Sequence, residues 1–273
     1  MGYLCTLNAA LAALNSTSTT SNDKLMDAIL RVSNRVEKRY PLEPTQRVRA
    51  YDATADYISR DGFELFLYTP LLEIDSVTVA GTTVSSLTYE TAPVGETPYT
   101  RLVKTSGDIW TTTGGASRRN AIRITGKWGW HPDYDNAWVA DTTLNGSINA
   151  SVTSVTFTSA TNLLPGMLIR VEDEYMRLLS KSTNTGTVKR GVNGTTAAAH
   201  ATLTAIDYYV PEPQISGAVA RLAAYAVHRI GQFEDKKFDL ETGIAVQYAW
   251  DMLPDARAVI NDALPKFRHS FAI

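Results

Sequence analysis

The sequence has one cysteine, four histidines, no long hydrophobic run and no excess of charge of either sign. The single cysteine, Cys5, excludes an intramolecular disulfide and a multi-cysteine metal site within one chain. The longest apolar stretch, residues 3–14, is too short and too interrupted to span a bilayer. The net charge of −2 argues against a protein whose main affinity comes from neutralising nucleic-acid phosphates.

The residues that are present are typical of a globular protein. Hydrophobic residues make up 44% of the 273 and charged residues 20%, with 17 Gly and 11 Pro, which counts against long disorder and fibrous repeats. Threonine is concentrated between residues 45 and 204. Because threonine favours strands, we expect a β-rich middle and helical ends.

Helical periodicity is clearest in residues 22–40, where an apolar stripe faces a basic one. The apolar stripe consists of Leu25, Ile29, Val32 and Val36. Pro41 then stops the helix. We expect further helices over residues 3–14, 211–231 and 245–264.

Period-two alternation predicts short strands between residues 46 and 130, and a second β region follows from 139 to 208 with Asn-Gly turn signals. The predicted fold class is therefore α+β: a helical bundle of about four helices with a β-sheet or hairpin layer, plus an inserted small all-β domain. The predicted main domain takes residues 1–138 and 209–273, and the inserted β domain takes residues 139–208.

No catalytic motif is visible in the sequence. The four histidines at positions 131, 200, 228 and 269 are scattered, and none lies in a zinc-protease, serine-hydrolase or Cys-His context. A glycine-rich phosphate-binding motif is also missing. We therefore predict that the protein is not an enzyme, with no catalytic residues, no metal ligands and no cofactor.

Two sets of charged residues each allow a functional and a purely structural interpretation. The acidic run 172–174 could suggest Ca²⁺, but its spacing matches no calcium loop, and a charged strand end or turn explains it better. The basic residues Arg31, Arg35, Lys38 and Arg39 could contact DNA, but a basic stripe opposite an apolar one is more often a solvated or partner-facing surface. We expect this stripe to be a helix face between subunits.

The tryptophans also allow two interpretations. Trp128 and Trp130, with Trp138 nearby, could form a platform on which sugar rings stack. Burial of the rings at a strand end is the commoner arrangement.

Several segments together resemble the head-tail connector family of tailed bacteriophages, the adaptor or head-completion proteins beneath the portal. The early helix ending in Arg-Tyr, the strands with a proline turn and an SVTV-x-G pattern, and a later strand ending in Trp-Gly-Trp are similar to those of the family. They lie at residues 29–40, 48–52, 63–70, 74–81 and 122–130. In relatives that last strand leads almost directly into a proline-led helix, matched here by 210–221. The segment 190–200 also looks like a small β module of phage structural proteins.

The resemblance implies a structural protein of the phage neck rather than an enzyme. Its copies would form a ring, typically a dodecamer, that docks on the portal vertex, joins it to the tail and extends the DNA channel during virion assembly and genome ejection. The C-terminal region commonly reaches toward the portal in this family, and the residues expected to dock there are Phe267, Arg268, Phe271 and Ile273.

The expected partners are the portal protein, neighbouring copies of the chain, and a tail-side stopper, terminator or tail protein. DNA would pass through the channel without sequence-specific binding, and no membrane is involved. The expected location is the neck of the virion, after synthesis in the host bacterial cytoplasm. An alternative interpretation is a virion-surface binding module that contacts glycans or a fibre through residues 139–208.

Overall fold

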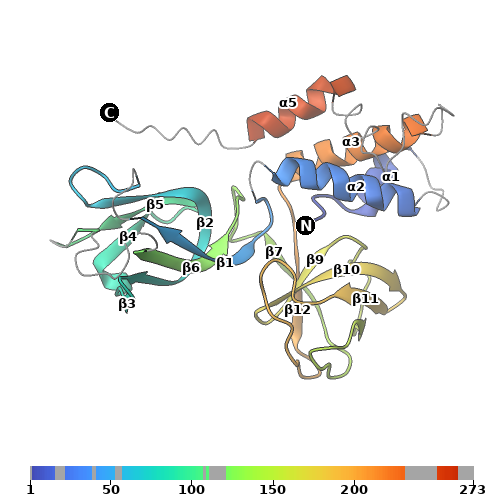
Figure 1. Cartoon of the computed structure of the whole chain (residues 1–273). Helices are drawn as coiled ribbons and strands as arrows, with labels where there is room; N and C mark the ends of the chain where they lie inside the picture. The colour runs from blue at the N-terminus through green and yellow to red at the C-terminus, as the bar shows by residue number, and fades with distance from the viewer. Residues whose placement is uncertain are drawn as a thin grey trace. The chain divides into compact units, whose positions relative to one another are not determined.

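The computed structural model describes residues 2–15, 22–38, 41–52, 57–106, 109–110, 121–230 and 251–263. These described residues form two antiparallel sheets of six strands each and four helices, with 37% strand and 25% helix (Figure 1). The described residues divide into two compact units, one formed by residues 41–135 and the other by residues 2–38 and 136–263.

The first unit contains the first sheet, in the strand order β1-β6-β2-β5-β4, with β3 paired to β2. A single 3-10 turn, η1 (Ser86–Thr88), precedes β4. The strands are β1 (Thr45–Tyr51), β2 (Glu64–Val79), β3 (Thr82–Thr83), β4 (Tyr89–Ala92), β5 (Tyr99–Lys104) and β6 (Ile122–Trp128).

The long strand β2 joins the two halves of the first sheet. Its first half pairs with β5, and from Leu71 onward it pairs with β6. Two of the separately expected strands, 64–68 and 74–79, are thus one continuous element that runs through Pro70. The alternate side chains of β2 are buried beside Trp128 and Tyr51, which are among the largest fully buried side chains. Burial of large rings of this kind is the main stabilising term of such a core.

The second sheet has the strand order β7-β12-β9-β10-β11-β8. Hydrogen bonds join the two ends of this order: Thr158 N–H donates to Thr143 O, and Asn145 N–H donates to Thr156 O. The sheet therefore curls into a small closed barrel, filled by apolar side chains such as Phe157. Its strands are β7 (Trp138–Thr143), β8 (Ser154–Thr156), β9 (Leu168–Val171), β10 (Glu174–Ser182), β11 (Thr185–Lys189) and β12 (Ala205–Tyr209).

Four helices accompany the barrel in the second unit: α1 (Leu7–Ala13), α2 (Asn22–Glu37), α3 (Pro213–Ile230) and α5 (Pro254–Ala263). The helix α3 packs against each of the other three. Local signals fix two of the starts, because Thr6 caps α1 and the Glu212 carboxylate accepts from Ile215 N–H at the start of α3. Among the described residues, no helix is long and apolar enough to cross a membrane.

The predicted apolar stripe of residues 22–40 is confirmed: Leu25, Ile29, Val32 and Val36 are all buried in α2. Ser33 on the same face accepts a hydrogen bond from Leu4 N–H at 2.9 Å, which ties the N-terminal segment to α2. The neighbouring Cys5 is buried, and burial raises the pKa of its thiol to about 12. This thiol is therefore protonated and unreactive at neutral pH.

The predicted fold class, a helical bundle with a β layer and an inserted domain, is wrong. The chain is built on two six-stranded antiparallel sheets, and its helices are few and short. The barrel belongs to the same compact unit as the helices. The amphipathic stripes identified helices correctly, but each stripe buries only one narrow face, whereas the two sheets enclose large apolar cores of their own.

Glycine at position 126 is required by the close approach of β2 and β6. A side chain there would collide with the backbone carbonyl of Glu73 on the neighbouring strand.

We expect Gly126→Ala to lower the free energy of unfolding by about 1–3 kcal/mol, measured by urea denaturation. The control is Gly217→Ala in α3, where no atom lies within 4 Å of the added carbon. It should stabilise the protein by about 0.5–1 kcal/mol. Equal effects of the two substitutions would contradict this account.

Candidate functional site

The strongest concentration of interacting charged side chains in the barrel is built around Glu174, the first residue of β10. Its side chain is only 1% exposed, and both of its oxygens are paired with Arg190: Nε donates to Oε1 and Nη2 to Oε2, each at 2.7 Å. Backbone N–H groups of Gly191 and Ala198 donate to the same carboxylate at 3.0 Å. This forked pairing is the strongest geometry for an arginine–carboxylate pair.

Arg190 also binds the backbone of two other segments. Its Nη1 donates to the carbonyl oxygens of Asn149 and Val152 at 2.9 Å, and its Nη2 donates to that of Ala198 at 2.6 Å. The guanidinium therefore holds together the β7–β8 connection, the start of β10 and the long loop before β12. Such a hub is costly to disrupt, because each lost bond leaves a buried polar group without its partner.

His200 completes the cluster from the end of that loop. Its Nε2 lies 2.8 Å from Glu174 Oε2 and its Nδ1 lies 2.7 Å from Glu172 Oε2. Since an ionised carboxylate only accepts hydrogen bonds, the ring donates to both only when both nitrogens carry protons. The imidazole is buried, whereas the Glu172 side chain is 61% exposed. His200 thus links a buried charge to one at the surface.

The surroundings of Glu174 stabilise its charged form. Burial alone raises the pKa of this carboxyl, but the hydrogen bonds from Arg190, Ala198 N–H, His200 and Gly191 N–H outweigh burial and lower it to about 2. The group is therefore ionised throughout the physiological range. Its contribution to stability is present above about pH 4.5, the usual value, and is lost as the pH falls toward about 2.

The cluster is suited to holding a loop rather than to catalysis or metal binding. Its donors and acceptors face one another, and no group of His, Cys, Asp or Glu able to hold a metal is found in the described part of the chain. The prediction of a charged strand end or turn at residues 172–174 is confirmed, because Glu172 lies in the turn between β9 and β10 and Glu174 begins β10. The burial of Glu174 in the cluster was not predicted.

No sequence motif predicted the cluster, but the hairpin that joins Glu174 to Arg190 explains it. The hairpin of β10 and β11 pairs Arg177 with Lys189, so its continuation brings Arg190 beside the start of β10. The interaction of Glu174 with Arg190 follows from this register rather than from spacing along the chain.

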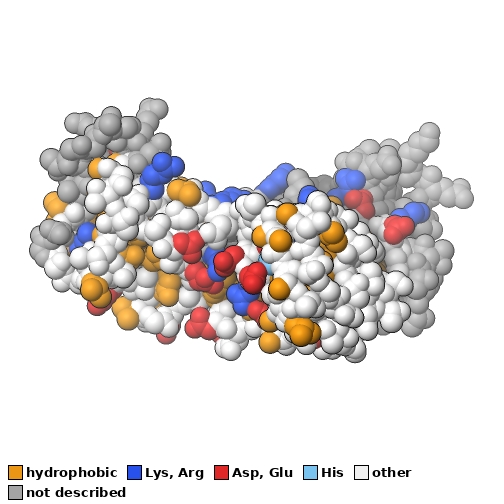
Figure 2. Space-filling view, turned by 90° about the horizontal axis from the view of Figure 1, so that it is seen from below, with side chains coloured by type: hydrophobic (Ala, Val, Ile, Leu, Met, Phe, Trp, Pro, Cys, Tyr) orange, Lys and Arg blue, Asp and Glu red, His pale blue; other side chains and the backbone are white. Residues whose placement is uncertain are grey.

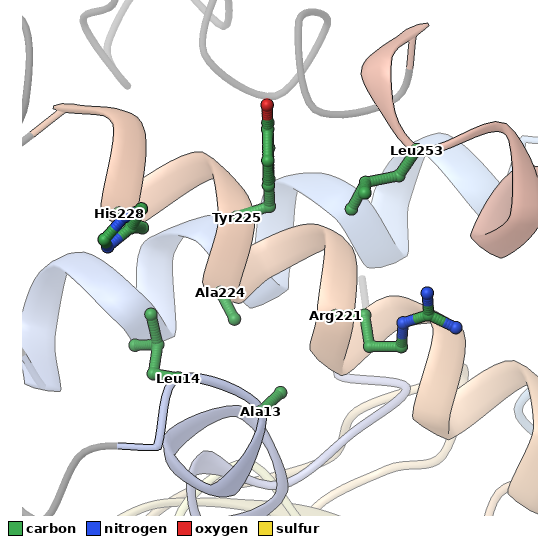
Figure 3. A pocket seen from close by; sticks show the side chains of 7 residues that line it. All are labelled: Ala13, Leu14, Arg221, Ala224, Tyr225, His228 and Leu253. Carbon is green, nitrogen blue, oxygen red and sulfur yellow. The ribbon is translucent and has the colours of Figure 1, made fainter.

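The other two described histidines lie elsewhere in the molecule. His131 is buried in the first unit, and His228 lines a pocket of about 320 Å³ on the helices. The pocket is lined by Ala13, Leu14, Arg221, Ala224, Tyr225, His228 and Leu253. Figure 3 shows that the polar ends of Arg221, Tyr225 and His228 are spread along α3 and do not converge on one point. The fourth histidine, His269, lies outside the described residues.

The predicted interaction residues fall in two places. Arg31 and Arg35 lie on α2, and Lys38 follows its last turn. Arg31 is bonded to Asp27 one turn earlier, at 2.8 Å. The expected portal-docking residues, Phe267, Arg268, Phe271 and Ile273, lie outside the described residues.

The tryptophans do not form an exposed aromatic platform around Trp128. Trp128 is 0% exposed in the core of the first sheet. Trp138 packs against the rings of Tyr175 and Tyr209, and the Arg170 guanidinium lies 4.6 Å from its ring centre.

On the face of the molecule seen in Figure 2, uncharged side chains and backbone cover most of the described surface, and acidic groups gather in one area.

Comparison with known proteins gives no match: no family model, curated protein or solved structure is similar to this chain.

The pKa of Glu174 predicts acid destabilisation. We expect the free energy of unfolding, from urea denaturation followed by circular dichroism, to fall between about pH 4.5 and about pH 2. Glu174→Gln should flatten this dependence and cost about 3–5 kcal/mol at pH 7, because it leaves the Arg190 charge buried and unpaired. The control Glu172→Gln removes the same charge at an exposed position bonded to the same histidine, and should cost below about 1 kcal/mol. Similar losses in both variants would refute the central role of Glu174.

Proposed function

We propose that this protein is a structural component of the neck of a tailed bacteriophage, whose copies form a ring that joins the portal vertex to the tail and extends the DNA channel. The proposal comes from the resemblance of its sequence segments to the connector family. It concerns assembly and mechanics rather than catalysis.

The observation that supports it most is that the segments carrying the resemblance are neighbours in space within each unit. Residues 48–52, 63–81 and 122–130 contribute to β1, β2 and β6, which are consecutive strands of the first sheet. Residues 29–40 and 210–221 contribute to α2 and α3, which pack on each other. The likenesses thus include elements that are far apart in the sequence and adjacent in the fold, such as α2 and α3, as expected for segments of one shared core.

The charge of the protein is compatible with a conduit. The net charge of −2 gives the chain no general attraction for the phosphate backbone. DNA that must leave the head through a channel should not be held by its wall. We propose that the portal contact uses the C-terminal residues Phe267, Arg268, Phe271 and Ile273, whose aromatic and basic side chains suit anchors that become buried on a partner.

Native mass spectrometry of the protein mixed with the portal protein of the same virus tests the proposal. We expect the portal complex to gain the mass of a whole ring of subunits, because a closed ring satisfies every subunit contact. The variant Phe267→Ala/Phe271→Ala should lose this mass gain while keeping the circular dichroism spectrum of the wild type.

The matched control is Phe63→Ala, which removes an equally aromatic and partly exposed side chain of the first unit. It should leave binding to the portal unchanged. A portal that gains no mass from the folded wild-type protein contradicts the proposed function. Full binding by the double variant contradicts only the role of the C-terminal residues.

A further inference from the structure

The outward side of α2 carries a stripe of basic residues. Lys24, Arg31, Arg35 and Lys38 follow one another at steps of seven, four and three, so they lie on one side of the helix, where Arg31 is also paired with Asp27 at 2.8 Å. Lys24 and Lys38 are exposed, and the Arg31 side chain is 34% exposed. These four residues are the basic face of α2.

The outward side of α5 is acidic. Asp255 and Asp262 are exposed and lie seven residues apart, with exposed Ala258 between them, whereas Ala256 and Ile260 on the opposite side are buried. Asp255 and Asp262 are the acidic face of α5.

The two faces belong to two different helices of one group. The central helix α3 packs against both α2 and α5, and those two helices pack on it rather than extensively on each other (Figure 1). The spacing also matches: Arg31 to Lys38 and Asp255 to Asp262 are both seven residues, or about 10.5 Å along a helix. One face therefore presents cations at the separation at which the other presents carboxylates.

We infer that copies of this chain associate head to tail, with the basic face of α2 in one copy against the acidic face of α5 in the next. The inference rests on the proposed function, because it specifies the contact between subunits of the ring. Two different faces that complement each other form a heterologous contact, which closes into a ring when the rotation per copy allows it.

The chemistry of the two faces makes the contact sensitive to salt. Each exposed ion pair contributes little by itself, and the attraction is screened at high ionic strength. Charge complementarity of this kind selects the partner and its orientation more than it adds affinity. Exposed Met252, beside the acidic face, supplies apolar surface that such a contact can bury.

A complementation experiment tests this contact. One variant carries Arg31→Glu/Lys38→Glu, which leaves two cations and two carboxylates on its α2 face and removes the attraction to an acidic face, and the other carries Asp255→Lys/Asp262→Lys, so that both of its faces are basic. We expect each alone to self-associate at least about tenfold more weakly than the wild type at low salt, by native mass spectrometry with and without the portal protein. An equimolar mixture should assemble again, with the two variants alternating.

Controls with equal changes of charge separate this contact from general electrostatics. Arg123→Glu/Lys189→Glu and Glu90→Lys/Glu96→Lys alter exposed residues outside the two faces and should assemble as the wild type does. Circular dichroism verifies that every variant is folded.

The outcomes separate the inference from the proposed function. Two outcomes overturn the α2–α5 contact and leave the proposed function standing. In the first, rings form on the portal regardless of the charge reversals. In the second, the folded variants stay dissociated when they are mixed, while the wild type assembles. A wild-type protein that forms no ring, alone or on the portal, overturns both.

Discussion

The forked pairing of Arg190 with Glu174 is the interaction on which the barrel depends most. A carboxylate that is 1% exposed is tolerated only when its charge and its lone pairs are matched, and here one arginine, one histidine and two backbone N–H groups supply the match. The same arginine binds the backbone of Asn149, Val152 and Ala198. Two long connections of the barrel are thereby fixed by one side chain.

Local patterns in the sequence predicted the elements better than their assembly. The steps of four and three among Leu25, Ile29, Val32 and Val36 reflect a helix face, and each of these residues is buried. The sequence patterns overestimated the helical part of the fold. Periodicity shows which face of an element is buried, but it does not show which other element packs against that face. The closure of the barrel between Thr143 and Thr158 depends on hydrogen bonds between distant segments, which no local pattern records.

The candidate site, too, could be predicted only in part from the sequence. The acidic run 172–174 was visible as three charges, but its residues have different roles: Glu172 is exposed in a turn and Glu174 is buried at the start of β10. What separates them is the alternation of a strand and the register of a hairpin. The basic residues of α2 were visible as a stripe in the sequence. The sequence did not show that the helix carrying the carboxylates of α5 packs on α3 as α2 does.

The closure of the barrel affects how this part of the molecule can meet other polypeptide chains. An open sheet offers the unpaired N–H and C=O groups of its outer strands as a template for strands of other chains, and so invites aggregation. In the barrel, the end of β7 is joined to the end of β8 through Thr143 and Thr158, and the backbone groups bonded there offer no such template. Another chain that meets this seam can therefore contact side chains but finds no free strand edge to pair with at the bonded residues.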